Sequence, residues 1–213
     1  MKDKDKFEIS SGWIALATIV ILLGIMVYSG ITFQPELENP QITYGEAPLE
    51  KNTGLQIKPG EEYVYAYDLG NSSVNITYLV SSGNNCTAVR LLENTNLSSV
   101  CLNEEGNGPS GSNVSLGDSA TLFFKPWMLA LDSNWKWNVS MYMSFQETRE
   151  IVSELNYRVM RTDRYRGRPC FVVEIETAEG SKEYNWVDKE KRVLLKTSGE
   201  TYDIELVKGL PLD

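Results

Sequence analysis

The chain has 213 residues, of which 42% are hydrophobic and 23% charged, and its formal net charge is −9. These proportions fit one globular domain with an appendage, and the acidic balance argues against nucleic acid as a partner. Because the chain contains no histidine, Ser-His-Asp and Cys-His catalytic groups and imidazole ligands for zinc are excluded.

An apolar run near the N-terminus predicts a membrane-spanning helix. No charged residue occurs from Trp13 to Phe33, and about 20 apolar helical residues cross a bilayer core of roughly 30 Å. A cleaved signal peptide and a pilin-type leader are the alternatives, but the run is long for the first and no basic-Gly processing site precedes it for the second. We therefore predict a cytoplasmic N-terminus over residues 1–11 and a transmembrane helix over residues 12–33.

The charges that flank this run predict its orientation. Lys2, Lys4 and Lys6 precede it, whereas no Lys or Arg lies between Phe33 and Lys51. Positively charged residues favour the cytoplasmic side of a membrane. The sequence therefore predicts a single-pass plasma-membrane protein that contacts the lipid bilayer through its N-terminal helix, with its N-terminus inside and its C-terminal domain outside.

The segment after the predicted span is rich in proline. Residues 34–60 contain four prolines and few large apolar residues, which is typical of an extended, semi-rigid spacer. We interpret residues 34–60 as an extracytoplasmic stalk and residues 61–213 as a β-rich extracytoplasmic domain.

Alternation of apolar and polar residues predicts most of this domain to be β-strand. In its clearest stretch, over residues 134–146, Trp135, Trp137, Val139, Met141, Met143 and Phe145 alternate with polar or less apolar residues. This period of two indicates one buried and one solvated face. Further strands are predicted over residues 61–69, 74–80, 87–92, 98–102, 155–162, 170–177, 182–188, 192–196 and 201–207.

One short helix interrupts the predicted strands. Ser144 and Glu147 have the spacing of a capping box, which predicts a helix over residues 148–155. The fold class that follows is mainly β: an N-terminal transmembrane helix, then an antiparallel sheet arranged as a meander, a sandwich or a half-barrel, with at most one or two short helices.

N-glycosylation sequons are frequent on the predicted outer side. Chance would give about two Asn-x-Ser/Thr matches in such a composition, whereas the chain has six within 68 residues, which favours glycosylation and surface exposure. The six candidates are Asn71, Asn75, Asn85, Asn96, Asn113 and Asn138.

The three cysteines permit one disulfide in an oxidising exterior. Three pairings are possible, and the pairing of Cys86 with Cys101 would close a short loop and stabilise the fold by about 3 kcal/mol. Cys170 lies in the apolar stretch CFVVEI, which favours a buried hydrophobic role. An intermolecular disulfide is its alternative role.

Arginines cluster around one predicted hairpin of the otherwise acidic chain. The sequons end before this cluster, so it lies in the sequon-free part of the sequence. It is interpreted either as a charged turn that discourages edge-to-edge pairing or as a patch for anionic lipid headgroups, an acidic glycan or an acidic partner. After Arg149, the cluster comprises Arg158, Arg161, Arg164, Arg166 and Arg168.

Other short motifs give no catalytic or metal-ligating residue. Gly117-Asp118-Ser119 resembles a serine-nucleophile sequence, but without a histidine base we interpret it as a turn. Residues 103–107 offer oxygen atoms for calcium, yet they lack the D-x-[DN]-x-[DN]-G spacing and are interpreted as a solvated loop. We therefore predict no catalytic residue, no metal site and no cofactor.

The last third of the chain carries a strand-turn-strand motif. Trp186, Val187 and Asp188 are followed, after a charged turn, by Val193 and Leu195. Over residues 157–207 this pattern resembles the sheet of LolA/LolB-like periplasmic lipoprotein carriers and their lipoprotein relatives. The resemblance implies a curved antiparallel sheet whose concave apolar face holds acyl chains or a partner segment. In overall composition the chain is similar to membrane-anchored surface proteins of archaea.

Together these features predict a non-enzymatic binding or scaffolding domain at the cell surface. Its expected partner is another membrane protein, an envelope component or a lipid. A lipid- or lipoprotein-handling module is the first alternative, because of the resemblance. An envelope enzyme that works without histidine is the second.

Overall fold

The structure of the protein is a computed structural model that describes residues 41–68, 72–93, 96–108, 111–114, 122–145 and 148–212. The unit that contains them begins at Gln41. The predicted cytoplasmic segment and spanning helix (residues 1–33) lie outside the described residues, as do Asn71 and the Gly117-Asp118-Ser119 turn. Within the described ranges, no helix has the length and apolar character needed to cross a membrane.

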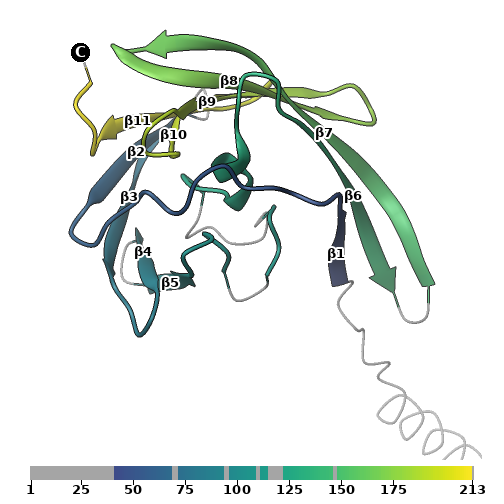
Figure 1. The fold of residues 1–213 in the computed structure, drawn as a ribbon, viewed down its shortest axis with the longest axis horizontal. Coiled ribbons are helices and arrows are strands. Elements are labelled where there is room, and N and C mark those ends of the chain that lie inside the picture. Colours follow the sequence, from purple (N-terminus) through teal and green to yellow (C-terminus); the bar gives the residue numbers. More distant parts are fainter. Residues whose placement is uncertain are drawn as a thin grey trace, which may run out of the picture. The chain divides into compact units, whose positions relative to one another are not determined.

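The described residues form a mainly β structure with almost no helix, as predicted. Eleven strands among them join in one antiparallel sheet, in the order β1-β6-β7-β8-β9-β10-β11-β2-β3-β4-β5 (Figure 1). The strands are β1 (Gln41–Glu46), β2 (Glu62–Asp68), β3 (Ser73–Ser82), β4 (Thr87–Glu93), β5 (Asn96–Leu102), β6 (Lys136–Phe145), β7 (Thr148–Tyr165), β8 (Arg168–Thr177), β9 (Lys182–Asp188), β10 (Leu194–Ser198) and β11 (Asp203–Lys208).

Two pairings between strands distant in sequence set this order. The last strand, β11, pairs with β2, so that Leu206 lies opposite Tyr65. The first strand, β1, pairs with β6, and Gln41 lies opposite Ser144. The remaining pairs are hairpins between consecutive strands. All the pairings are contiguous, so the sheet is continuous and is not a two-layer sandwich.

The stalk predicted over residues 34–60 is wrong for residues 41–60, which belong to the β unit. Residues 41–46 form strand β1, and further along the same stretch Ile57 is buried in the core. The backbone amides of Asn52 and Thr53 donate to the carbonyl oxygen of Leu129, at 2.9 and 3.2 Å. The β unit therefore begins at Gln41 and not at residue 61. The prolines of this segment had suggested a free spacer, but strand pairing and hydrogen bonds satisfy its backbone groups and its apolar side chains are buried.

The helix predicted over residues 148–155 is wrong, because these residues open the 18-residue strand β7. Along this stretch β7 pairs with β6, and Leu155 lies opposite Val139. A capping box is a local signal worth about 1 kcal/mol, whereas strand pairing satisfies every backbone group along the hairpin. The β-branched side chains of Ile151 and Val152 also favour a strand.

A segment that the strand pattern did not predict fills one face of the sheet. We name residues 122–131 the plug; they include the 3₁₀ helix η2 (Pro126–Ala130). Every plug residue from Phe123 to Leu131 is buried, and the sheet curves around this segment (Figure 1). We call the face against the plug the inner face and the opposite one the outer face.

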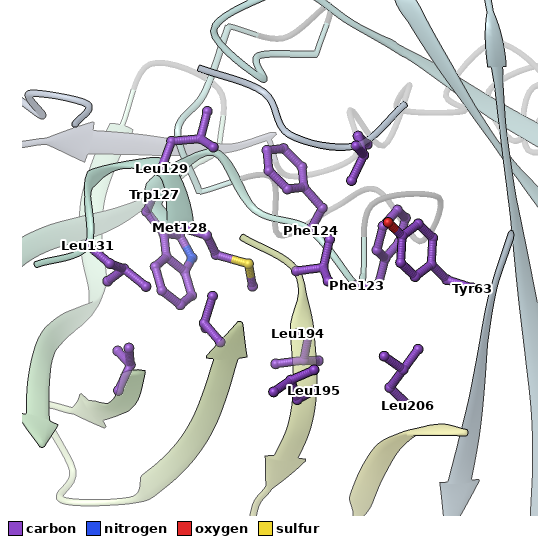
Figure 2. Close-up of a cluster of buried hydrophobic side chains, with 14 of the residues drawn as sticks. Tyr63, Phe123, Phe124, Trp127, Met128, Leu129, Leu131, Leu194, Leu195 and Leu206 are labelled. Atoms are coloured by element: carbon purple, nitrogen blue, oxygen red, sulfur yellow. The ribbon is translucent and has the colours of Figure 1, made fainter. Parts of the chain in front are cut away.

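Aromatic side chains join the plug to the inner face. The Phe123 ring lies 5.1 Å from that of Tyr63 and 4.7 Å from that of Tyr78. The Trp127 ring lies 5.5 Å from that of Tyr157. Figure 2 shows the Phe123 ring beside the Tyr63 ring, and Trp127 and Met128 on the side of the plug that faces Leu194 and Leu195. Such rings bury large apolar areas, so the plug forms the centre of the hydrophobic core.

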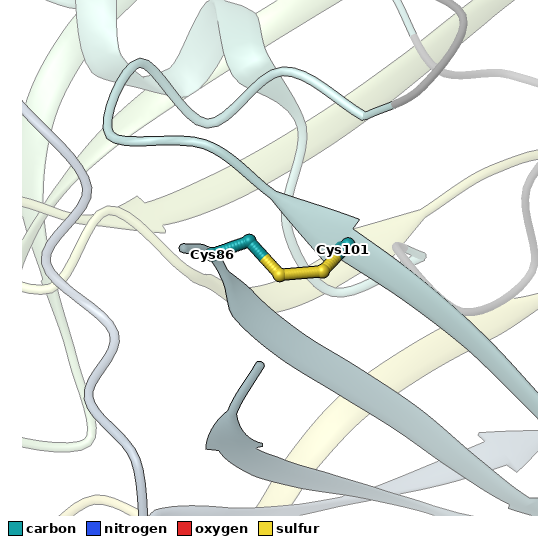
Figure 3. Close-up of a disulfide and its surroundings, with 2 residues drawn as sticks. All are labelled: Cys86 and Cys101. Atoms are coloured by element: carbon teal, nitrogen blue, oxygen red, sulfur yellow. A yellow bond between two sulfur atoms is a disulfide. The ribbon is translucent and has the colours of Figure 1, made fainter. Parts of the chain in front are cut away.

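The cysteines pair as the short-loop prediction expected. Cys86 and Cys101 form a disulfide with a Cα–Cα distance of 5.6 Å, which ties the β3–β4 turn to the edge strand β5 (Figure 3). Cys170 is free and fully buried in β8, which confirms the prediction of a hydrophobic role. Burial, with Asp163 and Asp188 nearby, raises the pKa of the Cys170 thiol to about 11.

Candidate functional site: the sequon-free middle of the sheet

The predicted arginine cluster lies on strands β7 and β8 and on the turn between them. Strand pairing places Arg158 opposite Glu174, and Arg161 opposite Val172. The turn places Arg166 in the left-handed region with φ 46°, followed by Gly167 with φ 75°. The cluster is therefore one hairpin, as the sequence predicted. Its surroundings are acidic, which the sequence alone did not reveal.

Arg168 joins the most buried of these acidic partners. Its Nε donates to Asp188 Oδ2 at 2.6 Å, and its Nη2 lies 3.4 Å from the exposed carboxylate of Glu190. The Asp188 side chain is fully buried. Hydrogen bonding to Asp188 raises the pKa of the Arg168 guanidinium further above its ordinary value, against the opposing effect of burial. A buried charge pair of this kind holds β8 to the end of β9.

Asp188 also organises the charged turn of the strand-turn-strand motif. Its Oδ1 accepts hydrogen bonds from the backbone amides of Glu190 at 3.0 Å and Lys191 at 2.6 Å. Arg192 completes the turn with φ 57°. A carboxylate that caps backbone amides in this way fixes a tight turn. The motif that carried the resemblance to lipoprotein carriers is therefore structural in this protein.

Arg158 begins a row of polar side chains across the outer face. Its Nη2 lies 2.5 Å from Glu174 Oε1, and the Tyr184 hydroxyl donates to Glu174 Oε2 at 3.0 Å. Lys182 approaches the same carboxylate at 3.5 Å. Burial raises the pKa of Glu174, but the hydrogen bonds from Arg158 and Tyr184 outweigh it and leave that pKa below its ordinary value. Glu174 is thus a buried anion enclosed by cations.

The end of the β7–β8 hairpin is attached to strand β11. Arg166 Nη2 lies 2.6 Å from Glu205 Oε1, and the Tyr165 hydroxyl donates to the same oxygen. The Tyr165 ring lies 6.4 Å from the Trp186 ring. Burial, followed by the contact with Glu205, raises the pKa of Tyr165 to about 12. These contacts fix the hairpin against the sheet and leave its aromatic rings half-buried.

The two remaining arginines of the predicted patch, Arg161 and Arg164, are exposed. Arg161 Nε lies 3.2 Å from Asp163 Oδ2, and both side chains are largely in solvent. Arg164 donates from Nη1 to the carbonyl oxygen of Gly167 at 3.1 Å. Four of the five patch arginines therefore have a carboxylate partner within the chain, so the hairpin presents arginine stems, aromatic rings and paired charges together.

The sequons fall on the flanks of the sheet. Asn138 lies on β6, and Asn75 lies on β3; both are exposed. Trp137, next to Asn138, and Tyr78, three residues after Asn75, are buried in the core, so alternation along each strand turns both asparagines to the outer face. In the sheet order these two strands enclose β7, β8, β9, β10, β11 and β2. Those six strands carry no sequon.

The other sequons differ in their surroundings. Asn85 is exposed in the β3–β4 turn, with φ 58°, and Asn96 begins the edge strand β5. Asn113 is half-buried, and its Nδ2 donates to Glu46 Oε2 at 2.9 Å. Glu46 also accepts hydrogen bonds from the Ser112 hydroxyl at 2.6 Å and from the Asn113 amide at 3.0 Å. Among the sequon asparagines whose burial the structure describes, Asn75, Asn85 and Asn138 are therefore exposed, and Asn113 is half-buried.

The side chain of Lys51 binds to the 103–107 loop that offered oxygen ligands for calcium. The Lys51 ammonium donates to the Glu105 carbonyl at 2.7 Å and to Asn107 Oδ1 at 2.8 Å. Asn103 Oδ1 accepts from the amides of Glu105 and Asn107, which shapes the loop as a turn. Burial lowers the pKa of Lys51, against the opposing effect of nearby Glu105. Within the described ranges, no group of three or more acidic or cysteine ligands is placed to hold a metal ion.

Two hollows of different character lie near the plug. A polar groove of about 720 Å³ runs between residues 49–54 and the 104–107 loop. A smaller cavity of about 140 Å³ separates the plug from the inner face, beside Tyr157 and Glu183. Glu183 accepts hydrogen bonds from Tyr202 and, at 2.7 Å, from Asn185 Nδ2. Ligand pockets typically have about 300–1,000 Å³, so the inner cavity is below that size.

No protein-family description matches the chain, and no curated protein matches it.

Proposed function

We propose that this protein is a membrane-anchored, extracytoplasmic domain with a non-enzymatic binding or scaffolding role at the cell surface. It contacts another membrane or envelope protein through the outer face of strands β7–β11. The observation that carries this proposal is the unbroken block of sequon-free strands between Asn138 and Asn75. Glycans at the two flanking asparagines would leave this middle face open to a protein partner.

The side chains on this face are of the kind that protein interfaces use. The Lys196 ammonium lies 5.9 Å from the centre of the Trp186 ring, and the Arg166 guanidinium lies 5.8 Å from that of Tyr165. Both rings are half-buried and already held by their neighbours. Tyr, Trp and Arg are enriched at the centres of interfaces, and fixed side chains lose little conformational entropy on binding.

The inner face offers less support for lipid or lipoprotein handling, the first alternative. The plug covers the face that would hold an acyl chain, and Phe123, Trp127 and Leu129 are buried there. A cavity of about 140 Å³ remains, which equals the liquid volume of about five water molecules. Carrying a lipid would require the plug to leave the sheet, at the cost of its aromatic contacts. We therefore place the functional surface on the outer face.

A glycan introduced into the middle of the sheet tests the binding face. Met160 is exposed on β7, and Met160→Asn creates an Asn-Arg-Thr sequon because Thr162 follows. The full chain is expressed in a host that glycosylates such sites, and neighbouring proteins are cross-linked on intact cells and identified by mass spectrometry. We expect the glycosylated variant to lose the cross-linked partner that the unmodified chain captures.

Two controls separate steric blocking from other effects. Met160→Asn combined with Thr162→Ala lacks the sequon and should retain the cross-linked partner. Glu179→Asn creates an Asn-Gly-Ser sequon at the exposed β8–β9 turn and should also retain it. Cross-linking that is unaffected by a confirmed glycan at residue 160 contradicts the proposed face.

The proposed topology has a separate test. Glycosidase treatment of the full chain from a glycosylating host should lower its mass, and the loss should map to Asn75, Asn85 and Asn138 before Asn113. A chain whose mass does not change would contradict the outward orientation, whatever the outcome of the cross-linking.

A further inference from the structure

The inner cavity lies against two rows of side chains that strand pairing places on the inner face. In the first row, Ile175 on β8 lies opposite both Tyr157 on β7 and Glu183 on β9. In the second row, Asn185 on β9 lies opposite Thr197 on β10. All five side chains line the cavity, and residues of the plug line it from the other side. The register of the sheet therefore encloses several polar groups between the sheet and the plug.

The polar side chains of these rows are joined by hydrogen bonds. The Asn185 amide donates from Nδ2 to Glu183 Oε1 at 2.7 Å, and its Oδ1 accepts from the Thr197 hydroxyl. The Tyr202 hydroxyl, which also lines the cavity, donates to Glu183 Oε2. Asn185 and Thr197 are only 4% and 3% exposed, whereas Glu183 and Tyr202 are half-buried. This network therefore leads from the surface into the buried part of the cavity.

The network offers an occupant more acceptors than donors. Among the described residues, the two hydrogen bonds to Glu183 use about half of the roughly four acceptor positions of a carboxylate. The Thr197 hydroxyl donates its proton to Asn185 and keeps its lone pairs. Because buried polar groups without partners cost free energy, we expect a molecule in this cavity to donate hydrogen bonds.

The two walls of the cavity carry opposite charges. Glu183 belongs to the sheet, and Lys125, which is buried in the plug, lines the same cavity. The negative charge of Glu183 acts on this interior: burial, followed by the charge of Glu183, raises the pKa of Tyr157 above its ordinary value. An ion of either sign would be repelled by one of the two charged side chains, so their combination favours an occupant without net charge.

The volume of the cavity limits the size of its occupant. It measures about 140 Å³, and a cavity of about 150 Å³ holds one molecule of benzene. The inner cavity can therefore hold about six non-hydrogen atoms. A hexose or an acyl chain is too large for it while the plug is in place.

We propose that the inner cavity is a binding site for a small polar molecule without net charge, of about six non-hydrogen atoms, that donates hydrogen bonds to Glu183 and Thr197. The ligand is either an uncharged polyol or a zwitterion such as a short amino acid, which have this chemistry in common. The site is on the opposite face of the sheet from the proposed protein-binding surface and does not depend on that surface or on the membrane anchor.

Equilibrium dialysis of the detergent-solubilised full chain against radiolabelled compounds tests this site. Glycerol and alanine are the probes that match its size and charge; acetate and ethylammonium test the charge, and glucose tests the size. We expect glycerol or alanine to bind. Glu183→Gln should weaken that binding at least about tenfold and Thr197→Val several-fold, because they remove a charged and a neutral acceptor. Glu179→Gln makes the same change at an exposed turn residue and should bind as the unmodified chain does.

The outcomes separate the proposal from its alternatives. Preference for glycerol identifies an uncharged ligand, and preference for alanine a zwitterion. If neither binds at millimolar concentration, water fills the cavity and the proposal is overturned. Tighter binding of acetate, ethylammonium or glucose also overturns it, as does a loss in Glu179→Gln equal to that in Glu183→Gln. Circular dichroism checks the fold of each variant, and Thr197→Val, which keeps the shape of the side chain, decides the result if Glu183→Gln does not fold.

Discussion

Strands β3–β5 and strands β7–β11 belong to one sheet, but different interactions stabilise the two regions. The disulfide between Cys86 and Cys101 ties the first region together, and this region carries the sequons Asn75, Asn85 and Asn96. The second has no sequon, and buried ion pairs such as Arg168–Asp188 join its strands. We propose that the second region, whose sequon-free strands are joined by ion pairs, presents the face for a protein partner.

The largest loss of stability should come from breaking the buried ion pair between Arg168 and Asp188 in the second region. Arg168→Ala leaves the Asp188 carboxylate buried without its guanidinium partner, which typically costs about 3–5 kcal/mol. We expect a loss of this size in the free energy of unfolding, measured by urea unfolding of the detergent-solubilised chain with tryptophan fluorescence. A loss below 1 kcal/mol would mean that the pair is not what joins β8 to the β9 turn.

Removing the disulfide of the first region should cause the next largest loss of stability. The double substitution Cys86→Ser and Cys101→Ser opens a loop of 15 residues, and loops of that length contribute about 3 kcal/mol. Addition of reductant to the unmodified chain should lower stability by the same amount. The double variant should not respond to reductant, because Cys170 is free and buried; a response there would contradict this assignment.

Acid should weaken the second region through Glu174. The folded-state pKa of this carboxyl lies below its ordinary value of 4.5, so its contribution to stability is complete above that pH and is lost as pH falls through the folded-state pKa. Glu61 has a lowered pKa as well, because hydrogen bonds from Lys191, Lys58 and Tyr63 outweigh burial. Urea unfolding between pH 6 and 3 should therefore show stability declining with acid, and Glu174→Gln should flatten this decline. An unchanged slope in the variant would contradict the role of Glu174.

The smallest effect is expected at the exposed pair of the hairpin. Arg161→Ala removes an ion pair with Asp163 that lies largely in solvent, and such pairs contribute about 0–1 kcal/mol. The same urea titration should detect little change. Because Arg161→Ala removes the same type of side chain as Arg168→Ala, it is the matched control for that variant. Equal losses of unfolding free energy in Arg161→Ala and Arg168→Ala would show that the burial of an ion pair does not determine its contribution to stability.

Local patterns in the sequence predicted most strands and the disulfide, but they missed the plug. Every residue from 122 to 131 except Lys125 and Pro126 is hydrophobic, so a signal was present. This apolar run has neither the alternation of a strand nor the length of a helix. A short apolar run also does not predict which surface of the protein it will cover. The acidic partners of the arginine cluster were missed for a related reason. Asp188 and Glu205 lie 20 and 40 residues from Arg168 and Tyr165, and only the pairing of strands brings them together.

The sequence by itself determined the strand-forming stretches and the absence of histidine chemistry. Each depends on neighbouring residues or on composition, so local propensity decides it. Only the tertiary structure decided that residues 41–46 form a strand, that 148–155 are not helical, and that sequon-free strands form one uninterrupted middle. These features depend on pairings between distant segments, such as β1 with β6 and β11 with β2. The free energy of such pairings comes from backbone groups satisfied across the sheet and side chains buried together, which no single stretch of sequence contains.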